Sequence, residues 1–429
     1  MRFAIYTLGC KVNQYETQAM ETLLTGRGHT LVPFDGEADV YLVNTCSVTA
    51  VSDKKCRNII RRARRDHPLA VVGVCGCYAQ ASPQEVQALG VDVISGTGRR
   101  TDFLDQVENC ALTREPSLSV DDALRRKEPF ETLPAGGLPG RTRAMLKVED
   151  GCANFCTYCI IPYTRGPVRS VSLQGAAEQA RGLAQAGYQE LVLTGIEISS
   201  WGRDLKTGQT LIDLVEAVCA AAPGLRVRLG SLEPRTVTED FCRRAAALPN
   251  LCPHFHLSLQ SGCDETLARM HRRYDTARFL ESCRLLRQYF DRPAITTDLI
   301  CGFPGETEEE FARTLAFLQE AQFSAMHIFP YSRRPGTVAD KLPGQLSNAA
   351  KEARCHRAAD VAAEMERAYL SLWVGETLEV LFEETAEGLW RGHAPNYVEV
   401  YAPGENLHNV LRTVRVTSVR GSALEGVIL

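Results

Sequence analysis

The sequence predicts an α/β protein in three parts: an N-terminal flavodoxin-like parallel sheet, a central partial (β/α)6 barrel and a small C-terminal all-β barrel of OB type. Two patterns predict this fold. Short apolar, β-prone runs alternate with helical stretches over most of the chain, which is typical of parallel sheets with crossover helices. Residues 373–429 instead hold only short alternating runs separated by turns, as small β-barrels do.

The N-terminal domain is expected to span residues 1–112. Strands are predicted at residues 2–8, 40–43 and 70–74, with helices at 14–25 and 54–66 between them. The periodicity fails over residues 113–142, where Pro and Gly gather without a clear apolar face. This stretch is predicted to be a linker.

The central domain is expected to span residues 143–372. Its apolar runs lie at residues 145–148, 191–193, 227–229, 255–259, 295–300 and 326–329, and each but the last precedes a helical stretch. An active site is expected at the C-terminal ends of these strands. A long helix over 347–372 leads to the third domain, residues 373–429, with strands predicted at 377–382, 396–401, 410–419 and 424–428.

Composition narrows the class of protein. With 45% hydrophobic and 23% charged residues, the 429-residue chain is neither disordered, collagenous nor coiled-coil. No apolar run of membrane-spanning length and no signal peptide is present, so we expect a soluble, cytoplasmic protein without a membrane partner. The formal net charge is −4, so a polyanion would have to be held by local basic patches.

Sixteen cysteines are unusual for such a chain, because cytosolic thiols stay reduced and serve in packing, metal binding or catalysis. The sharpest pattern is GCANFCTYC, which contains Cys152, Cys156 and Cys159 and follows the first strand of the central domain. Three thiolates at this spacing can hold a [4Fe-4S] cluster and leave one iron free for a small molecule. The alternatives are a zinc site, which needs a fourth ligand, or buried thiols.

Three more cysteines follow strands of the N-terminal domain: Cys10 ends RFAIYTLGC, Cys46 ends VYLVNTC and Cys77 ends VVGVCGC. Residues just past the carboxyl ends of parallel strands converge on one crevice. A second open cluster is therefore expected, and the alternative is that buried thiols occupy the sheet edge by chance. Cys75 is expected to pack, because a fourth thiolate would close the site, and the remaining cysteines are assigned no role.

Together these residues resemble the methylthiotransferases of the radical S-adenosylmethionine (SAM) superfamily over essentially the whole chain. The CxxxCxxC loop is similar to the superfamily signature; TLGCKVNQYET, ADVYLVNTCSVT and GCYAQ resemble the methylthiotransferase N-terminal domain, and RGHAPNYVEV resembles a TRAM domain. The motif GCKVNQYE is most similar to the branch that modifies N6-threonylcarbamoyladenosine beside the anticodon of tRNA, at position 37. Sister branches act on isopentenyladenosine in tRNA or on an aspartate of a ribosomal protein.

The resemblance implies two [4Fe-4S] clusters and SAM. One SAM would chelate the free iron at Cys152, Cys156 and Cys159 and be cleaved to a 5′-deoxyadenosyl radical that attacks C2–H of adenine. The cluster on Cys10, Cys46 and Cys77 would hold a sulfur that a second SAM methylates before transfer. A one-electron donor such as a flavodoxin or ferredoxin and a sulfur source are implied as partners.

Further positions are similar to cofactor contacts of the superfamily. They follow the cluster loop and the strand ends, and they are Tyr158, Thr194, Gly195, Glu197, Gln260 and Gly302. Glu197 departs from the residue expected after Thr-Gly-Ile. The alternative is that these are barrel loops that need turn residues.

Evidence for RNA is local. The stretch KKCRNIIRRARR holds seven basic residues in twelve, namely Lys54, Lys55, Arg57, Arg61, Arg62, Arg64 and Arg65. Arg165 and Arg169, after the cluster loop, are further candidate RNA contacts. Such a face attracts phosphates, although a merely solvated helix face is the alternative.

Residues 373–429 contain four basic and eight acidic residues, which does not suit simple phosphate binding and keeps the ribosomal-protein substrate open. A non-enzymatic alternative is an Fe–S redox sensor or scaffold, which would bind clusters without cleaving SAM.

Overall fold

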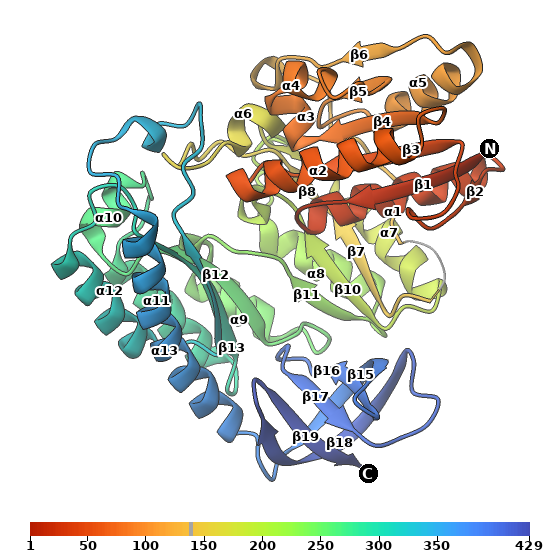
Figure 1. Ribbon diagram of the computed structural model, residues 1–429. Helices are drawn as coiled ribbons and strands as arrows, with labels where there is room; N and C mark the ends of the chain where they lie inside the picture. The colour runs from red at the N-terminus through yellow and green to blue at the C-terminus, as the bar shows by residue number, and fades with distance from the viewer. Residues whose placement is uncertain (137–139) are drawn as a thin grey trace.

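The computed structural model describes residues 1–136 and 140–429. They form two α/β domains and a C-terminal barrel (Figure 1). The N-terminal sheet has six parallel strands in the order β2-β1-β3-β4-β5-β6. Its strands are β1 (Arg2–Thr7), β2 (Thr30–Leu31), β3 (Val40–Thr45), β4 (Val71–Gly76), β5 (Val93–Ser95) and β6 (Ser117–Ser119). This order confirms the flavodoxin-like prediction and places a topological switch point between β1 and β3.

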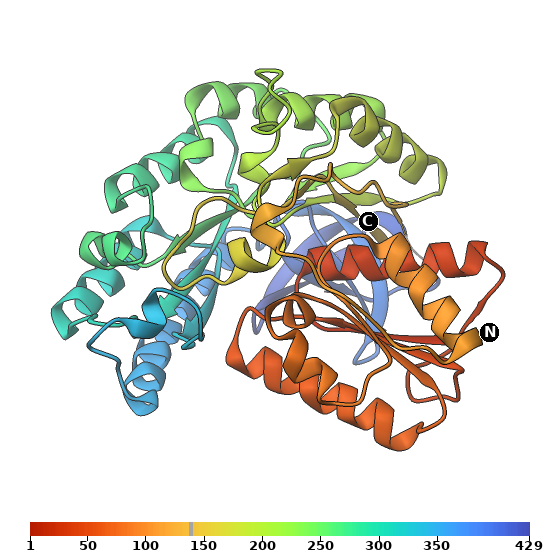
Figure 2. The same ribbon diagram turned by 90° about the horizontal axis from the view of Figure 1, so that it is seen from above.

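Helices cover both faces of this sheet (Figure 2). The helices α1 (Lys11–Gly26) and α5 (Arg100–Thr113) pack on one face through residues such as Met20 and Phe103. On the other face lie α2 (Ala50–Asp66), α3 (Cys77–Ala81) and α4 (Pro83–Gln87). The apolar runs of β3 and β4 are buried throughout, as expected for strands sandwiched between helices.

Part of the stretch predicted as a linker belongs to this sheet. Residues 117–119 form β6, which pairs in parallel with β5, and Ala123–Arg125 form the short helix η1. A three-residue edge strand carries too little periodicity to be recognised in a sequence rich in Pro and Gly.

The central domain is the predicted partial barrel. Two three-stranded parallel sheets, β7-β10-β11 and β12-β13-β14, are joined by the bridges Val227↔Leu251 and Leu232↔Leu257. The six strands are β7 (Arg143–Lys147), β10 (Glu190–Thr194), β11 (Arg226–Leu229), β12 (His254–Gln260), β13 (Ala294–Cys301) and β14 (Ala325–Pro330). In β12, Phe255, Leu257 and Leu259 are buried in the main core, so the intervening side chains face the inside of the barrel.

The outer layer and the connections complete this domain. Its helices are α6 (Ile161–Arg165), α7 (Leu173–Gln185), α8 (Leu211–Ala221), α9 (Glu239–Ala246), α10 (Asp264–Arg269), α11 (Thr276–Tyr289), α12 (Glu308–Ala321) and the long α13 (Asn348–Ser371). A small antiparallel pair, β8 (Glu149–Asp150) and β9 (Arg169–Ser170), brackets the cysteine loop, and the short helices η2 (Ile198–Ser200), η3 (Pro234–Thr236) and η4 (Ala339–Lys341) lie in connections.

The C-terminal part is a closed barrel in the order β15-β16-β17-β19-β18, which confirms the OB-like prediction. The strands are β15 (Thr377–Ala386), β16 (Leu389–His393), β17 (Glu399–Ala402), β18 (Val410–Arg420) and β19 (Ala423–Ile428). The sequence pattern missed β16. Gly392 of β16 has to be a glycine, because a Cβ would come 2.2 Å from the Leu381 carbonyl oxygen of the paired strand β15.

In Figure 1 this barrel lies beneath β10 and β11, on the side away from the N-terminal sheet. Within the residues that the structure describes, no helix combines the length and apolar character needed to cross a membrane.

Candidate functional site

The first cysteine group, called the N-terminal trio, consists of Cys10, Cys46 and Cys77. Cys46 and Cys77 directly follow β3 and β4, and Cys10 follows β1 after Leu8 and Gly9; the three strands are neighbours in the sheet. Gly9 has a φ of +119°, and a Cβ there would lie 2.9 Å from the Cβ of Cys46. The two loops therefore touch at a position that only glycine fits.

The thiols of the N-terminal trio also influence one another. Burial raises the pKa of Cys77 to about 11, and the nearby charges of Cys10 and Cys46 act in the same direction while Arg165 opposes them. Burial likewise raises the pKa of Cys46. Cations or a metal are needed to hold such thiols as thiolates.

The second group, called the barrel trio, consists of Cys152, Cys156 and Cys159 on the loop between β8 and α6. The loop is held by its backbone: the Cys152 amide donates to the Gly166 carbonyl at 3.0 Å, and the Cys159 amide donates to the Cys156 carbonyl at 2.9 Å. Burial raises the pKa of Cys159 to about 12 and that of Cys152 further above its usual value.

Arg272, from the loop after α10, adds a cation to the barrel trio. Its Nη1 lies 3.1 Å from the Sγ of Cys156, and its Nε donates to the Tyr274 hydroxyl at 3.1 Å. The guanidinium also lies over the Tyr274 ring, 4.9 Å from its centroid. These contacts hold the Arg272 guanidinium beside the Cys156 sulfur.

The two trios face each other across the junction of the first two domains. Helix α3, which begins at Cys77, packs against α6, which follows Cys159. A charge on Cys77 acts on the pKa of Cys159, so the two thiols lie within electrostatic reach. The geometry thus brings both predicted cluster positions to one site.

A buried ion network joins the domains beside this site and corrects two predicted RNA contacts. Arg165 is fully buried, with Nη1 2.6 Å from Oε1 of Glu16 and Nη2 2.9 Å from Oδ1 of Asn13. Arg169 is also buried and lies 3.2 Å from Oδ2 of Asp150. Arg165 therefore bridges the two domains, whereas Arg169 contacts Asp150 and the Arg165 carbonyl oxygen within the central domain. Because both guanidiniums are buried against protein acceptors, they are not placed to meet RNA phosphates.

The predicted cofactor positions after β10 are occupied by internal contacts. Thr194 is buried, and a Cβ at Gly195 would lie 2.8 Å from Oε2 of Glu149. Glu149 accepts the Glu197 amide at 2.7 Å, while the Glu197 carboxylate caps η2 through the Ser199 amide at 3.1 Å. Glu197 therefore shapes its loop.

Glu149 of β8, which contacts the loop after β10, is an unusual carboxyl group. It is fully buried and its Oε1 has no partner, and burial raises its pKa well above the usual carboxyl range. An unpartnered acceptor beside the cysteine loop was not found by sequence reasoning, which had no signal to separate it from an ordinary strand residue.

The other predicted cofactor positions differ in what surrounds them. Gly302 has a φ of +73°, a Cβ there would meet Lys351 at 2.6 Å, and its amide donates to Glu306 at 2.8 Å, so packing explains the glycine. Gln260 ends β12 with a φ of +67° and is half-buried at the strand end. Tyr158 packs edge-on to Phe303 with ring centroids 6.5 Å apart.

Two more cysteines lie near the N-terminal trio. Cys75 is fully buried among core residues such as Phe3 and Met20, in agreement with the expected packing role. Cys56 of α2 lies behind Cys46, with its Sγ 3.3 Å from the Cys46 carbonyl oxygen. Sequence reasoning gave Cys56 no role because it lies in the basic helix rather than at a strand end.

Helix α2 carries the seven predicted basic contacts, but they are not equivalent. Arg57 lies 3.7 Å from Glu85, Arg62 and Arg65 contact Asp66, and Arg64 pairs with Asp92. Lys54, Lys55 and Arg61 are exposed and have no ion-pair partner within the described part of the chain. These three are the cations available to a polyanion.

The acidic residues of the C-terminal barrel have a structural use that the sequence did not reveal. Glu376 lies 3.2 Å from Arg292, Glu379 lies 2.8 Å from Arg226 and Glu383 lies 2.7 Å from Arg143, all arginines of the central domain. Three of the eight acidic residues of this barrel thus dock it against the central domain.

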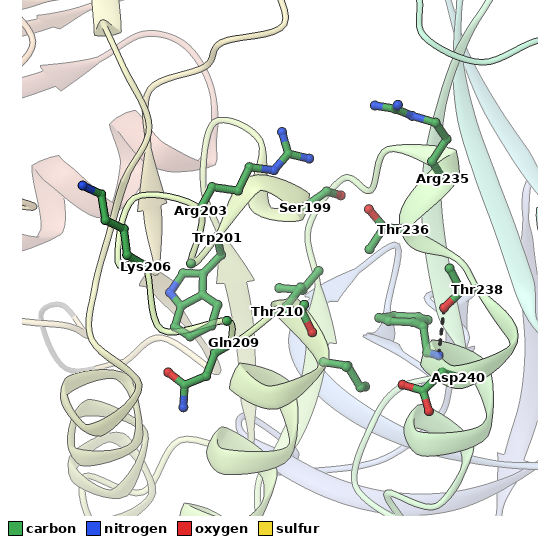
Figure 3. Close-up of a pocket in the computed structure, with 15 residues that line it drawn as sticks. Ser199, Trp201, Arg203, Lys206, Gln209, Thr210, Arg235, Thr236, Thr238 and Asp240 are labelled. Carbon is green, nitrogen blue, oxygen red and sulfur yellow. Dashed lines mark hydrogen bonds between the residues drawn. The ribbon is translucent and has the colours of Figure 1, made fainter.

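A hollow of about 500 Å³ lies beside the C-terminal ends of β10 and β11 (Figure 3). Arg203, Lys206 and Arg235 rim it, and the Phe241 amide donates to the Thr238 hydroxyl at its edge. None of the predicted site residues lines this hollow.

The donor chemistry of the two trios fits iron–sulfur clusters. Across residues 1–136 and 140–429, no three His, Cys, Asp or Glu side chains already surround a single metal position. The thiolates that hold a [4Fe-4S] cube lie farther apart than the ligands of a single metal ion. The type of donor therefore decides whether these residues suit a cluster. Each trio offers three free thiols. The positive charge of Arg165 acts on the N-terminal trio and that of Arg272 on the barrel trio, which suits a cluster held by thiolates.

Comparison with known proteins agrees with this chemistry. A family described as "Uncharacterized protein family UPF0004" matches residues 2–96, and the Radical SAM superfamily matches residues 146–318. The solved structure of the radical SAM methyltransferase TsrM from Kitasatospora setae, with cobalamin and a [4Fe-4S] cluster bound, has a TM-score of 0.57 at 16% identity and covers 91% of this chain and 80% of that chain. Fold and cysteine loop together define a radical SAM enzyme.

Sequence relatives narrow the class. The threonylcarbamoyladenosine tRNA methylthiotransferase MtaB of Bacillus subtilis is 39% identical over 408 residues, 94% of this chain and 90% of the relative. The tRNA-2-methylthio-N(6)-dimethylallyladenosine synthase of Moorella thermoacetica is 33% identical over 435 residues, 99% and 97% of the two chains. The chain belongs to the radical SAM methylthiotransferase family, which implies a [4Fe-4S] cluster and SAM and excludes a merely structural cluster scaffold.

Proposed function

We propose that this enzyme converts N6-threonylcarbamoyladenosine at position 37 of tRNA, beside the anticodon, to its 2-methylthio derivative. The meeting of the two trios at one domain junction carries the proposal, because transfer of a methylthio group needs a radical source and a sulfur carrier close together. The name of the Bacillus subtilis relative supports this substrate.

Each domain has its own part in this proposal. Residues 1–112 hold the second cluster, residues 143–372 hold the first cluster and SAM, and residues 373–429 form a TRAM domain. When bound, the cluster on the barrel trio supplies the electron that cleaves SAM, and a second [4Fe-4S] cluster on the N-terminal trio holds the sulfur to be transferred. SAM is proposed to bind near Tyr158 of the cysteine loop and Gln260 at the end of β12, whereas Thr194 and Gly195 pack against the protein itself.

The protein side chains prepare this chemistry. The Arg272 guanidinium lies over the Tyr274 ring and contacts the Cys156 sulfur at 3.1 Å, so it holds that sulfur in place. Arg165 spans from Glu16 and Asn13 in the N-terminal domain to Asp150, directly before the cysteine loop. This rigid connection fixes the distance between the trios, which a radical reaction requires.

The substrate adenine has to leave its stack to reach a site between two domains, so the anticodon loop is expected to present it splayed out. Lys54, Lys55 and Arg61 of α2 are proposed to hold the RNA backbone. The proposal further requires a one-electron donor such as a flavodoxin or ferredoxin, a sulfur source and, as for tRNA modification generally, the cytoplasm.

The test is mass spectrometry of tRNA nucleosides from a strain that lacks the gene, with and without its restoration. The proposal expects 2-methylthio-N6-threonylcarbamoyladenosine to vanish and return while the isopentenyl derivative is unchanged. Loss of the isopentenyl derivative alone would assign the enzyme to the branch of the Moorella thermoacetica relative. If neither nucleoside changed, the ribosomal-protein aspartate would become the substrate to test.

A further inference from the structure

A cavity of about 670 Å³ lies where the three domains meet. Its wall includes Lys11 and Gln18 of α1, Arg143 and Arg228 from strands of the central domain, and Tyr397 of the C-terminal barrel. In Figure 1 the C-terminal barrel lies beneath β10 and β11 of the central domain. Lys11 directly follows Cys10 of the N-terminal trio in the chain.

The charges that line this cavity are paired, with one exception. Arg143 lies 2.7 Å from Glu383, Arg228 lies 2.7 Å from the buried Glu190, and Arg141 lies 3.7 Å from Glu21. The second carboxylate of the wall, Glu384, is engaged by Arg391. Lys11 alone among these cations has no carboxylate within 4.0 Å in the described structure.

A second group in the wall also lacks a partner. Gln18 is only 3% exposed, and its Oε1 has no hydrogen-bond donor. A buried acceptor left unpaired costs free energy unless a ligand or water satisfies it. The cavity therefore offers one unpaired cation and one unpaired acceptor, which together suit a ligand with an anion and a nearby donor.

We infer that this cavity binds the threonylcarbamoyl group of the substrate, with Lys11 pairing with its carboxylate and Gln18 accepting from its hydroxyl or ureido N–H. This inference rests on the proposed function and assigns the specificity of the same site. Because Lys11 follows Cys10 in the chain, we expect a base presented to the N-terminal trio to bring its N6 substituent toward Lys11.

The same groups work against the sister substrate. An isopentenyl group has neither an anion nor a donor, so it would leave Lys11 without a counter-ion and the buried Gln18 Oε1 without a hydrogen-bond donor. A site that is built to pair polar groups discriminates strongly against an analogue that lacks them. The selectivity of the enzyme would then reside in α1 and not in the cysteines that carry the chemistry.

The test measures equilibrium binding of synthetic anticodon stem-loops to the reconstituted enzyme by fluorescence anisotropy. Three RNAs differ only at position 37: N6-threonylcarbamoyladenosine, its threonine methyl ester, and unmodified adenosine. The wild type is expected to bind the first at least about 10-fold more tightly than the other two, the range of a charge-assisted contact. In Lys11→Ala this preference is expected to fall to about one, with binding of the unmodified loop unchanged.

Two variants serve as controls. Lys11→Arg keeps the charge and is expected to keep most of the preference for the free carboxylate. Lys206→Ala removes a cation from the separate hollow in Figure 3 and is expected to keep the full preference. Iron content of each variant shows whether the N-terminal trio is intact beside residue 11.

The outcomes separate this inference from the proposed function. If the wild type prefers the threonylcarbamoyl loop and Lys11→Ala keeps that preference, the assignment of the cavity is overturned and the function stands. If the wild type shows no preference and the tRNA nucleosides of the deletion strain are unchanged, both fall.

Discussion

Glu16 is the residue on which the domain junction depends. Its carboxylate accepts Arg165 at 2.6 Å and Arg100 and Lys147 at 3.1 Å each, and all of these side chains are buried. Burial opposes ionisation, but the charges of Arg100, Arg165 and Lys147 outweigh it and hold the pKa of Glu16 well below its usual range. The carboxylate therefore stabilises the folded state by staying charged.

Replacing Glu16 with glutamine keeps the shape and removes the charge. Within the described residues, Lys147 and Arg165 then have only Asp150 as a carboxylate partner, and Arg100 has none. Loss of one partner of a buried ion pair costs about 3–5 kcal/mol. Urea unfolding of Glu16→Gln is expected to show this loss, while Glu37→Gln at an exposed site is expected to change stability by less than about 0.5 kcal/mol. Equal stabilities of the two variants would show that the network does not stabilise the junction.

The wild type and Glu16→Gln are also expected to differ in how their stability depends on pH. Because the pKa of Glu16 is depressed in the folded state, its contribution is present above the unfolded carboxyl pKa of about 4.3 and is lost as the pH falls below that value. The wild type is thus expected to lose stability below about pH 4.3 more steeply than Glu16→Gln. Parallel curves for the two proteins would contradict the assignment.

Gly9 tests whether the N-terminal trio binds a cluster. Gly9→Ala forces a Cβ to within 2.9 Å of the Cys46 Cβ at a left-handed φ, whereas Gly28→Ala has a similar backbone but meets nothing within 4 Å. After anaerobic reconstitution, iron is expected to fall from about eight to about four atoms per chain in Gly9→Ala and to stay near eight in Gly28→Ala. Four irons in the wild type would leave room for only one cluster.

At the scale of elements, α2 shows what charge patterns in a sequence can and cannot predict. The run of seven basic residues predicted a uniformly cationic face. Folding brings Glu85 and Asp92 from other segments against Arg57 and Arg64, so only Lys54, Lys55 and Arg61 remain unpaired within the described residues. Contacts distant in sequence decide which charges stay available, and no periodicity reports them.

These three cations lead to a salt-dependent prediction. Each phosphate contact contributes about 0.7–0.9 to the slope of log affinity against log salt. The triple variant Lys54→Ala, Lys55→Ala, Arg61→Ala is expected to weaken tRNA binding and to reduce that slope by about two to three. The charge-conserving pair Lys54→Arg, Lys55→Arg is expected to keep it. An unchanged slope in the triple variant would move the RNA to another face.

At the scale of the whole molecule, the alternation of strands and helices predicted the two α/β domains, and the short strands of residues 373–429 predicted the barrel. The cysteines after β1, β3 and β4 predicted a common site, because parallel strands end at one edge. The docking of the domains was not predictable in this way. Arg165 and Arg169 read as exposed charges in sequence, but Glu16 and Asp150 enclose them. Likewise the acidic barrel suggested a protein partner, whereas Glu379 and Glu383 face arginines of the central domain.

Tyr397 is the centre of that docking. Its ring stacks on His254 of β12 and on His393 of β16, each 4.9 Å away, and the Arg228 guanidinium lies 4.7 Å from its centroid. Stacking and cation–π contacts of this kind contribute about 0.5–1.5 kcal/mol each. Together they hold the C-terminal barrel against the cavity that Lys11 and Tyr397 line.

Tyr397→Ala is therefore expected to loosen the C-terminal barrel by about 2 kcal/mol or more, which corresponds to opening at least about 10-fold more often. Hydrogen exchange is expected to accelerate in β16 and β11, on the two sides of the interface, and to remain unchanged in the N-terminal sheet. Tyr397→Phe keeps the ring and is expected to exchange as the wild type does. If both variants kept slow exchange, the ion pairs of Glu379 and Glu383 alone would be sufficient for docking, and the aromatic stack would be left to shape the cavity wall.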